Sequence, residues 1–195
     1  SMEAFDRLVQ SGKVRYVGTS NDTAYGLTKA LMASKYKGLT RFETIQNNFS
    51  MLNRRFLDEL GAVCDREQVS LLAYSPLAGG VLSGKYQNGF PSDARFGVYA
   101  AMDDGRMKAQ ASRFAGERSL ALTGKYLEIA RGAGINPVTL AMGWSLSFSF
   151  LGSSIFGVTK KSQLPDILAS VDAVIPRDVF AALDKAHSEI LYPMG

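Results

Sequence analysis

The stretch "SLLAYSPLAGGVLSGKY" (Ser70–Tyr86) joins a short apolar run directly to a glycine-rich loop. The apolar run ends at Pro76 and is typical of a buried β-strand. From Gly79 the loop nearly matches the phosphate loop of nucleotide hydrolases, which reads Gly, four residues, Gly, Lys, then Ser or Thr. Tyr86 stands where that motif needs a short hydroxyl for Mg²⁺, which disfavours such a hydrolase. A relaxed loop with a solvated Lys85 and a phosphate contact of another kind both stay open.

The same order of strand and helix recurs on both sides of this stretch. Strands are expected at 14–21, 42–49, 70–76 and 153–159, and helices at 3–12, 23–36, 53–69, 117–131, 137–149, 161–170 and 176–190. The segment 79–116 is expected to be a long loop with at most short helical pieces, and 176–195 a closing helix and tail. Helix caps are expected at Asn21 or Asp22, at Asn53 and at Asn136.

Strands this short and apolar, alternating with helices, indicate an α/β fold with a parallel sheet. Four β/α units make half of an eight-stranded TIM-type barrel, so we predict a half barrel forming a single domain over 1–195. An open four-stranded arc leaves two unpaired edges and an uncovered inner face. These edges and this face could be covered by a missing N-terminal half or by a second copy in a homodimer. Alternatively, the strands could collapse into a small open sheet.

Composition excludes several classes of protein. The 195 residues are 46% hydrophobic and 21% charged, which is ordinary for a globular domain. The net charge of +4 is scattered, so no nucleic-acid surface is expected, and the apolar runs are too short to predict a membrane span. Cys64 lies at helical spacing from Leu57 and Leu60, which predicts a buried thiol without a disulfide and a cytoplasmic location. His187, on the closing helix, is expected at a surface or interface rather than in catalysis.

Polar side chains are expected at the carboxyl ends of the strands, where parallel β/α barrels bind ligands. Ser20, Asn21 and Gln46 offer groups that donate and accept hydrogen bonds, the complement that a carboxamide needs. Helix capping and turn formation are the alternative for Ser20 and Asn21. Tyr74 offers a flat face for stacking on an aromatic ring, with core packing as its alternative.

Two basic residues follow the third strand. Lys85 and Arg95 could hold phosphate, although either alone is usually a solvated charge. A carboxamide, an aromatic ring and a phosphate at one edge together describe a nicotinamide dinucleotide.

Five stretches of the chain resemble one family. "GKVRYVGTSN", "TIQNNFSMLNR", "YSPLAGGVLSGKY", "NPVTLAMGWSL" and "FGVTKKSQL" are similar, in this order, to the C-terminal half of the aldo-keto reductases. The branch that contains potassium-channel β subunits is the nearest. The resemblance runs from about Phe5 to about Leu183.

The resemblance implies a (β/α)₈ barrel that binds NADPH in an extended form. It assigns Ser20, Asn21, Gln46 and Tyr74 to the nicotinamide, Ser75, Pro76, Leu77, Ala78 and Gly79 to the pyrophosphate, Lys85 and Arg95 to the phosphates, and Gly157, Thr159, Gln163 and Asp166 to the adenosine end. Ile167 stands where the family usually has an Asn directed at the adenine, which leaves the preference for NADPH over NADH open. Lys160 is a further basic residue near this end.

The same resemblance implies an Asp, Tyr, Lys and His set for proton transfer, carried by strands that precede the Ser20 strand. No catalytic residue and no metal site is therefore expected in this chain. We predict the cofactor-binding half of an NADPH-dependent oxidoreductase that reduces small-molecule carbonyl substrates in the complete barrel, with little or no activity alone. The alternatives are a non-catalytic dinucleotide-binding or regulatory protein and an inactive truncated fragment.

Overall fold

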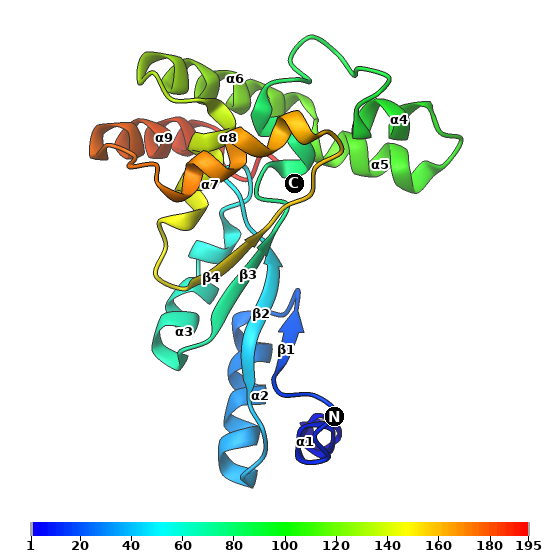
Figure 1. Cartoon of the computed structure of the whole chain (residues 1–195), viewed down its shortest axis with the longest axis vertical. Helices are drawn as coiled ribbons and strands as arrows, with labels where there is room; N and C mark the ends of the chain where they lie inside the picture. The colour runs from blue at the N-terminus through cyan, green and yellow to red at the C-terminus, as the bar shows by residue number, and fades with distance from the viewer. Residues whose placement is uncertain (1, 195) are drawn as a thin grey trace.

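Four parallel strands form the sheet of this protein, in a computed structural model that describes residues 2–194 (Figure 1). The strands are β1 (Val17–Ser20), β2 (Phe42–Asn48), β3 (Ser70–Tyr74) and β4 (Leu151–Ile155). They lie in chain order, and each pairs in parallel with the next. The predicted α/β fold with half of an eight-stranded parallel barrel is confirmed.

Helices follow each strand and also open the chain. The α-helices are α1 (Met2–Gln10), α2 (Ala24–Lys37), α3 (Leu60–Glu67), α4 (Arg95–Ala101), α5 (Gly105–Phe114), α6 (Glu117–Gly132), α7 (Pro137–Leu146), α8 (Leu164–Leu168) and α9 (Arg177–Glu189). Short 3₁₀ helices are η1 (Arg55–Leu57), η2 (Ala78–Ser83), η3 (Lys161–Gln163) and η4 (Ala169–Val171). Within residues 2–194, no helix combines the length and the apolar character that a membrane crossing requires.

Several predicted boundaries are wrong, and strand pairing explains two of them. Strand β1 begins at Val17 rather than at residue 14, because Val17 pairs with Phe42, where β2 itself begins. Strand β4 ends at Ile155 rather than at residue 159, because its partner β3 ends at Tyr74. Helix α7 ends at Leu146, and the segment 79–116 holds two α-helices, α4 and α5, of seven and ten residues.

Of the predicted helix caps, one is correct and the others are wrong. Asn136 caps α7, because its side chain accepts the N–H groups of Val138 and Thr139. Thr23, rather than Asn21 or Asp22, caps α2. Asn53 caps no helix: it forms an isolated bridge with Ser50, and the predicted helix 53–69 divides into η1 and α3.

The two faces of the sheet differ in burial. On the face toward the helices, the side chains of Ile45, Leu71 and Ala73 are fully buried. On the other face Gln46 is exposed, and Ile155 keeps 41% of its surface in contact with solvent. Within residues 2–194, neither β1 nor β4 pairs with a further strand on its outer edge. The expected uncovered face and unpaired edges are therefore present.

An aromatic cluster fills the core between the sheet and the later helices. The ring of Phe49, just after β2, lies 5.0 Å from Trp144 of α7 and 5.2 Å from Phe148. Phe148 in turn stacks on Phe150 at 5.3 Å. Such pairs stabilise a core beyond the area they bury. Cys64 is buried as predicted, and burial raises the pKa of its thiol to about 11, so the thiol stays protonated and unreactive.

Candidate functional site

Four predicted residues meet at the carboxyl ends of the first three strands. The hydroxyl of Tyr74 donates to the Asn21 side-chain oxygen at 2.9 Å, and the Asn21 amide nitrogen donates to Ser20 Oγ at 3.1 Å. Ser20 Oγ donates to the backbone oxygen of Gln46 at 3.0 Å. We call Ser20, Asn21, Gln46 and Tyr74 the rim. Hydrogen bonds thus hold three strand ends in one constellation.

The backbone of Asn21 turns the chain at the end of β1. Its φ of 53° lies in the left-handed region, which Asn tolerates better than most residues. Its N–H donates to the Gln46 carbonyl at 3.0 Å and to Asn47 Oδ1 at 2.8 Å. The Asn21 side chain contacts rim residues rather than the start of α2. Helix capping therefore does not explain this residue.

The loop after β3 folds back in a tight turn. Ser75, Ala78 and Gly79 all have positive φ, at 54°, 49° and 66°, and the Ala78 N–H donates to the Ser75 carbonyl. A side chain at Gly79 would come within 2.4 Å of the Phe96 ring, so only glycine fits there. Non-glycine residues in this conformation cost energy and often mark ligand sites. Pro76 and Leu77 lie within the same turn, so the predicted pyrophosphate segment forms one folded-over loop.

Three cations gather beside this turn. The Lys85 ammonium packs against Gly80, where an added Cβ would lie 2.8 Å from Nζ. Its partial burial lowers the pKa of Lys85, and the charges of Arg95 and Lys160 lower it further, while Asp93 opposes them. Lys160 Nζ pairs with the Asp93 carboxylate at 2.8 Å. We call Lys85, Arg95 and Lys160 the basic cluster. Its mutual repulsion favours a bound anion.

Tyr86 resolves the ambiguity of the glycine-rich loop. Its ring is 1% exposed, and its hydroxyl accepts the backbone N–H of Phe96 at 3.3 Å. The segment Ala78–Ser83 is a distorted 3₁₀ helix, and no α-helix follows Lys85 before Arg95. Tyr86 is a core residue without the geometry of a Mg²⁺ ligand. Lys85 remains as a point charge near the turn.

The residues expected at the adenosine end follow β4: Gly157 and Thr159 lie in the loop, and Gln163 and Asp166 lie in η3 and α8. The side-chain oxygen of Gln163 accepts the N–H groups of Thr159 and Lys160, which closes the loop onto η3. Gly157 is exposed in this loop, while the backbone carbonyl of Asp166 accepts the hydroxyl of Thr139 on α7. The segment expected at the adenosine end therefore combines an exposed loop at Gly157 and Thr159 with the partly buried residues Gln163 and Asp166.

Two further residues after β4, Lys160 and Ile167 of α8, lie in different surroundings. Ile167 is only 3% exposed, so its side chain belongs to the core and offers nothing to a ligand. Lys160 joins the basic cluster through Asp93 and Lys85. Its charge is therefore placed with the residues expected at the phosphates.

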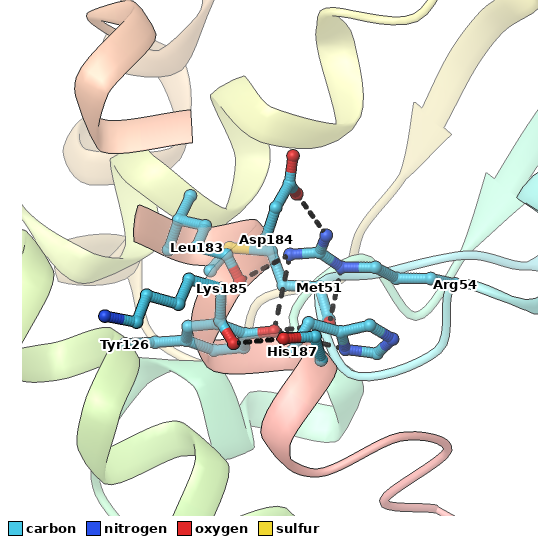
Figure 2. Close-up of polar contacts among 8 residues, drawn as sticks. Met51, Arg54, Tyr126, Leu183, Asp184, Lys185 and His187 are labelled. Atoms are coloured by element: carbon cyan, nitrogen blue, oxygen red, sulfur yellow. Dashed lines mark hydrogen bonds and ion pairs between the residues drawn. The ribbon is translucent and has the colours of Figure 1, made fainter. Parts of the chain in front are cut away.

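A buried polar network lies outside the predicted site (Figure 2). Arg54 is 8% exposed, and its Nη1 lies 2.6 Å from the Asp184 carboxylate. Its Nη2 donates to the Tyr126 hydroxyl at 3.3 Å, and its guanidinium stacks over Trp144 at 4.7 Å. The Tyr126 hydroxyl also lies 3.4 Å from His187 Nδ1. The network ties the loop after β2 to α6 and α9.

His187, expected at a surface or interface, is instead buried within this chain. Its side chain is buried against Tyr126 and Arg54. Burial lowers the pKa of His187 to about 4, with a further contribution from the Arg54 charge. Burial likewise raises the pKa of Tyr126 to about 12. The apolar stripe of α9 was the available signal, since His187 follows Leu183 at i+4 and therefore shares its buried face.

These features define a parallel β/α protein, half of an eight-stranded barrel, with polar side chains gathered at the carboxyl ends of its strands. Residues 1–188 match the Aldo/keto reductase family, and the chain belongs to this family of oxidoreductases. The resemblance drawn from the sequence is thereby confirmed.

Three relatives show how much of the family fold is present. The chain is 34% identical to Protein tas of Escherichia coli over 194 residues, which cover 99% of this chain and 54% of that protein. It is 30% identical to a probable voltage-gated potassium channel subunit beta of Arabidopsis thaliana, covering 97% of this chain and 56% of that protein. It is 28% identical to a putative aryl-alcohol dehydrogenase of Schizosaccharomyces pombe, covering 97% and 51%. The chain spans about half the length of these curated relatives.

Proposed function

We propose that this chain is the cofactor-binding half of an NADPH-dependent aldo-keto reductase that converts a carbonyl to an alcohol. The observation that carries the proposal is the hydrogen-bonded rim, in which the Tyr74 hydroxyl donates to Asn21 beside Ser20 and Gln46. The basic cluster stands beyond the same strand ends, across the turn after β3. A carboxamide site, a flat ring and phosphate-binding charges thus share one edge of the sheet.

Each group in the site has a distinct task. The amides of Asn21 and Gln46 would hold the nicotinamide carboxamide, and the Tyr74 ring would support the nicotinamide face. The turn Ser75–Gly79 and the basic cluster would bind the pyrophosphate and further phosphate groups. When bound, the cofactor supplies the hydride. The loop with Gly157, Thr159, Gln163 and Asp166 would receive the adenosine.

Proton transfer to the substrate needs a group that this half does not contribute in our proposal. The acid-base set would come from strands that precede β1 in a complete barrel. The uncovered sheet face and the unpaired edges of β1 and β4 support such a completion. Either an N-terminal half or a second copy of the chain would supply it. We therefore expect little turnover by the chain alone.

A second candidate function is non-catalytic binding of a dinucleotide. The rim and the basic cluster both lie within this chain, so cofactor binding does not depend on the acid-base set. The printed name of one relative, a potassium channel subunit beta, suggests a regulatory setting for such binding. Turnover of an aromatic aldehyde by the purified chain would exclude this candidate and would also overturn the division of labour proposed above.

Fluorescence titration with NADPH tests the proposal. Saturable binding with a dissociation constant below about 1 mM is expected, equivalent to roughly 4 kcal/mol. Lys85→Met should weaken NADPH about tenfold and leave reduced nicotinamide mononucleotide nearly unchanged. Lys108→Met, on the exposed face of α5, is the matched control for loss of one charge. Equal losses for both ligands would contradict the phosphate role, and no binding at 1 mM would contradict the proposal itself.

A further inference from the structure

A cavity of about 220 Å³ opens next to the rim, and no cofactor assignment above uses most of it. Asn21 and Tyr74 belong to its lining, which also includes Asn48, Arg55 and Arg113 and no member of the basic cluster. The lining comes from the ends of the first three strands, from the segment between β2 and the start of α3, and from the last turn of α5. All of these segments belong to this chain.

Two guanidinium groups face this cavity without a carboxylate partner. Neither Arg55 nor Arg113 forms an ion pair among the residues 2–194. Arg55 lies over the Tyr192 ring at 5.0 Å, and Arg113 over the Phe114 ring at 6.0 Å. Stacking orients a guanidinium plane and leaves its N–H groups free for a planar anion.

Asn48, at the end of β2, also lines the cavity and carries an unpaired acceptor. The side-chain oxygen of Asn48 is buried and has no hydrogen-bond partner among the described residues. Buried polar atoms are rarely left unpaired in native structures, and such exceptions often indicate a missing ligand or solvent contact. The Asn48 oxygen itself has almost no accessible surface, so the two guanidinium groups are the polar groups that can meet a ligand. They match a molecule that carries a carboxylate.

The buried network in Figure 2 explains why Arg55 is available to the cavity. Arg54, its neighbour in sequence, is anchored in the core by Asp184, Tyr126 and the Met51 carbonyl. With Arg54 fixed inward, Arg55 follows it at the start of η1 and lines the open cavity. The network thus positions Arg55 without touching a ligand itself.

We propose that this cavity is the subsite for the carboxylate of the carbonyl substrate, so that the substrate class is carboxylated aldehydes or ketones and their hydroxy-acid products. The inference rests on the proposed function, because the rim would place the nicotinamide beside Asn21 and Tyr74 in the cavity lining. Phe56 and Leu60 complete the lining with apolar surface that suits an aromatic or short aliphatic body. An engineered cavity of roughly 150 Å³ holds benzene, so the volume is sufficient for such a molecule.

Two product-like probes of equal shape test the subsite. The probes are 4-(hydroxymethyl)benzoate and 4-methylbenzyl alcohol, which differ in the carboxylate and do not react with lysine. Nuclear magnetic resonance of the chain, with and without NADPH, should show the benzoate shifting the Asn48 side-chain amide and the Nε–Hε signals of Arg55 and Arg113. The benzoate should bind at least tenfold more tightly than the alcohol.

Arginine substitutions in and beside the cavity test which charges bind the benzoate. Arg55→Met combined with Arg113→Met should remove that tenfold preference, and Arg113→Met alone should reduce it. Arg106→Met removes the same charge from α5 but does not line the cavity, so it should change benzoate affinity less than twofold. Equal affinity for the two probes, or an equal loss in Arg106→Met, would overturn the inference. Inorganic phosphate that displaces the benzoate with higher affinity would overturn it in favour of a phosphate site.

The outcome separates the two proposals. Binding of NADPH without benzoate preference would reject the subsite and leave the proposed function standing. Benzoate binding without any NADPH binding would reject the proposed function, and with it the assignment of the anion as substrate. Displacement of the benzoate by NADPH would assign the cavity to the cofactor and overturn the subsite.

Discussion

The two faces of the sheet differ in how deeply their side chains are buried. Leu71 of β3 faces the helices and is fully buried, whereas its neighbour Leu72 points to the other face and is only partly covered. Polar groups beyond the strand ends also differ: the Arg54 guanidinium is buried and paired with protein groups, while most of the rim is exposed.

This difference separates the part of the chain that stabilises the fold from the part that is available to ligands. Burial of Leu71 and the hydrogen bonds of Arg54 increase the free energy of unfolding. The rim, the basic cluster and the uncovered face contribute little to it and retain free hydrogen-bonding capacity. Variants on the two sides should therefore affect different measurements.

The largest effect is expected at the covered face. Leu71→Ala should lower the free energy of unfolding by about 3 kcal/mol, because it leaves a cavity at a fully buried position. Leu72→Ala, one residue further along β3, should cost less than about 1 kcal/mol in a monomer. Urea unfolding measures both. Equal losses would contradict the difference between the faces, and a Leu72→Ala loss that grows with protein concentration would indicate that a second copy covers the open face.

The next effect concerns the buried guanidinium. Arg54→Met should cost about 2–3 kcal/mol, because the carbonyls of Met51 and Leu183 and the Tyr126 hydroxyl lose a donor. Asp184 is largely exposed, so its charge stays solvated and adds little to the loss. Urea unfolding of Arg55→Met provides the control, with a change below about 0.5 kcal/mol. Similar losses in the two variants would contradict the inward anchoring of Arg54.

A pH effect follows from His187. Its pKa is lowered to about 4 in the folded state, first by burial and then by Arg54, while Asp184 and Asp58 oppose the shift. The unfolded chain binds a proton near pH 6.5 and the folded chain does not, so stability is complete above that pH and falls as pH decreases toward 4. Acidification from pH 7 to 5 should cost about 1–2 kcal/mol through this group.

The variant His187→Gln isolates that contribution. It keeps a polar contact for Tyr126 and removes the titrating group, while Arg54, Asp184 and Asp58 remain. Its unfolding free energy should fall by about 1–2 kcal/mol less than that of the native sequence between pH 7 and 5. Parallel pH profiles for the two proteins would show that His187 is not held neutral.

The smallest expected losses of stability compare the cap of α2 with the rim. Thr23→Ala should cost about 1 kcal/mol, because the Thr23 hydroxyl oxygen accepts the Gly26 N–H at the start of α2. Ser20→Ala removes a hydroxyl of the exposed rim and should cost less than about 0.5 kcal/mol. Thermal unfolding of the two variants measures both losses. A larger loss at Ser20 would assign a structural role to the rim.

Local patterns in the sequence predicted much of this structure. Strand-helix alternation predicted the parallel half barrel, and the residues after each strand predicted the rim, since the ends of parallel strands share one edge. The buried Cys64 and the cap at Asn136 followed from spacing alone. The basic cluster was predicted in part, with Lys85 and Arg95 assigned to phosphate and Lys160 to the adenosine end.

Long-range packing set the features that local patterns missed. The ends of β1 and β4 depend on partner strands distant in sequence. Arg54 and Asp184 are 130 residues apart, so neither residue alone indicates a buried ion pair. Asn21 is held by Ser20, Asn47 and Tyr74, so Thr23 caps α2, and Asn53 bridges Ser50 and caps no helix. The cavity beside the rim requires α5 to fold over the strand ends, which a segment predicted as loop could not show.

The central claim is that the rim receives a nicotinamide, and backbone amide shift mapping with reduced nicotinamide mononucleotide tests it most directly. Signals of Ser20, Asn21, Gln46 and Tyr74 should move together along one saturation curve, and Tyr74→Leu should abolish that response. Rim signals that stay unchanged at about 10 mM ligand, while signals on α6 and α9 move, would contradict the claim.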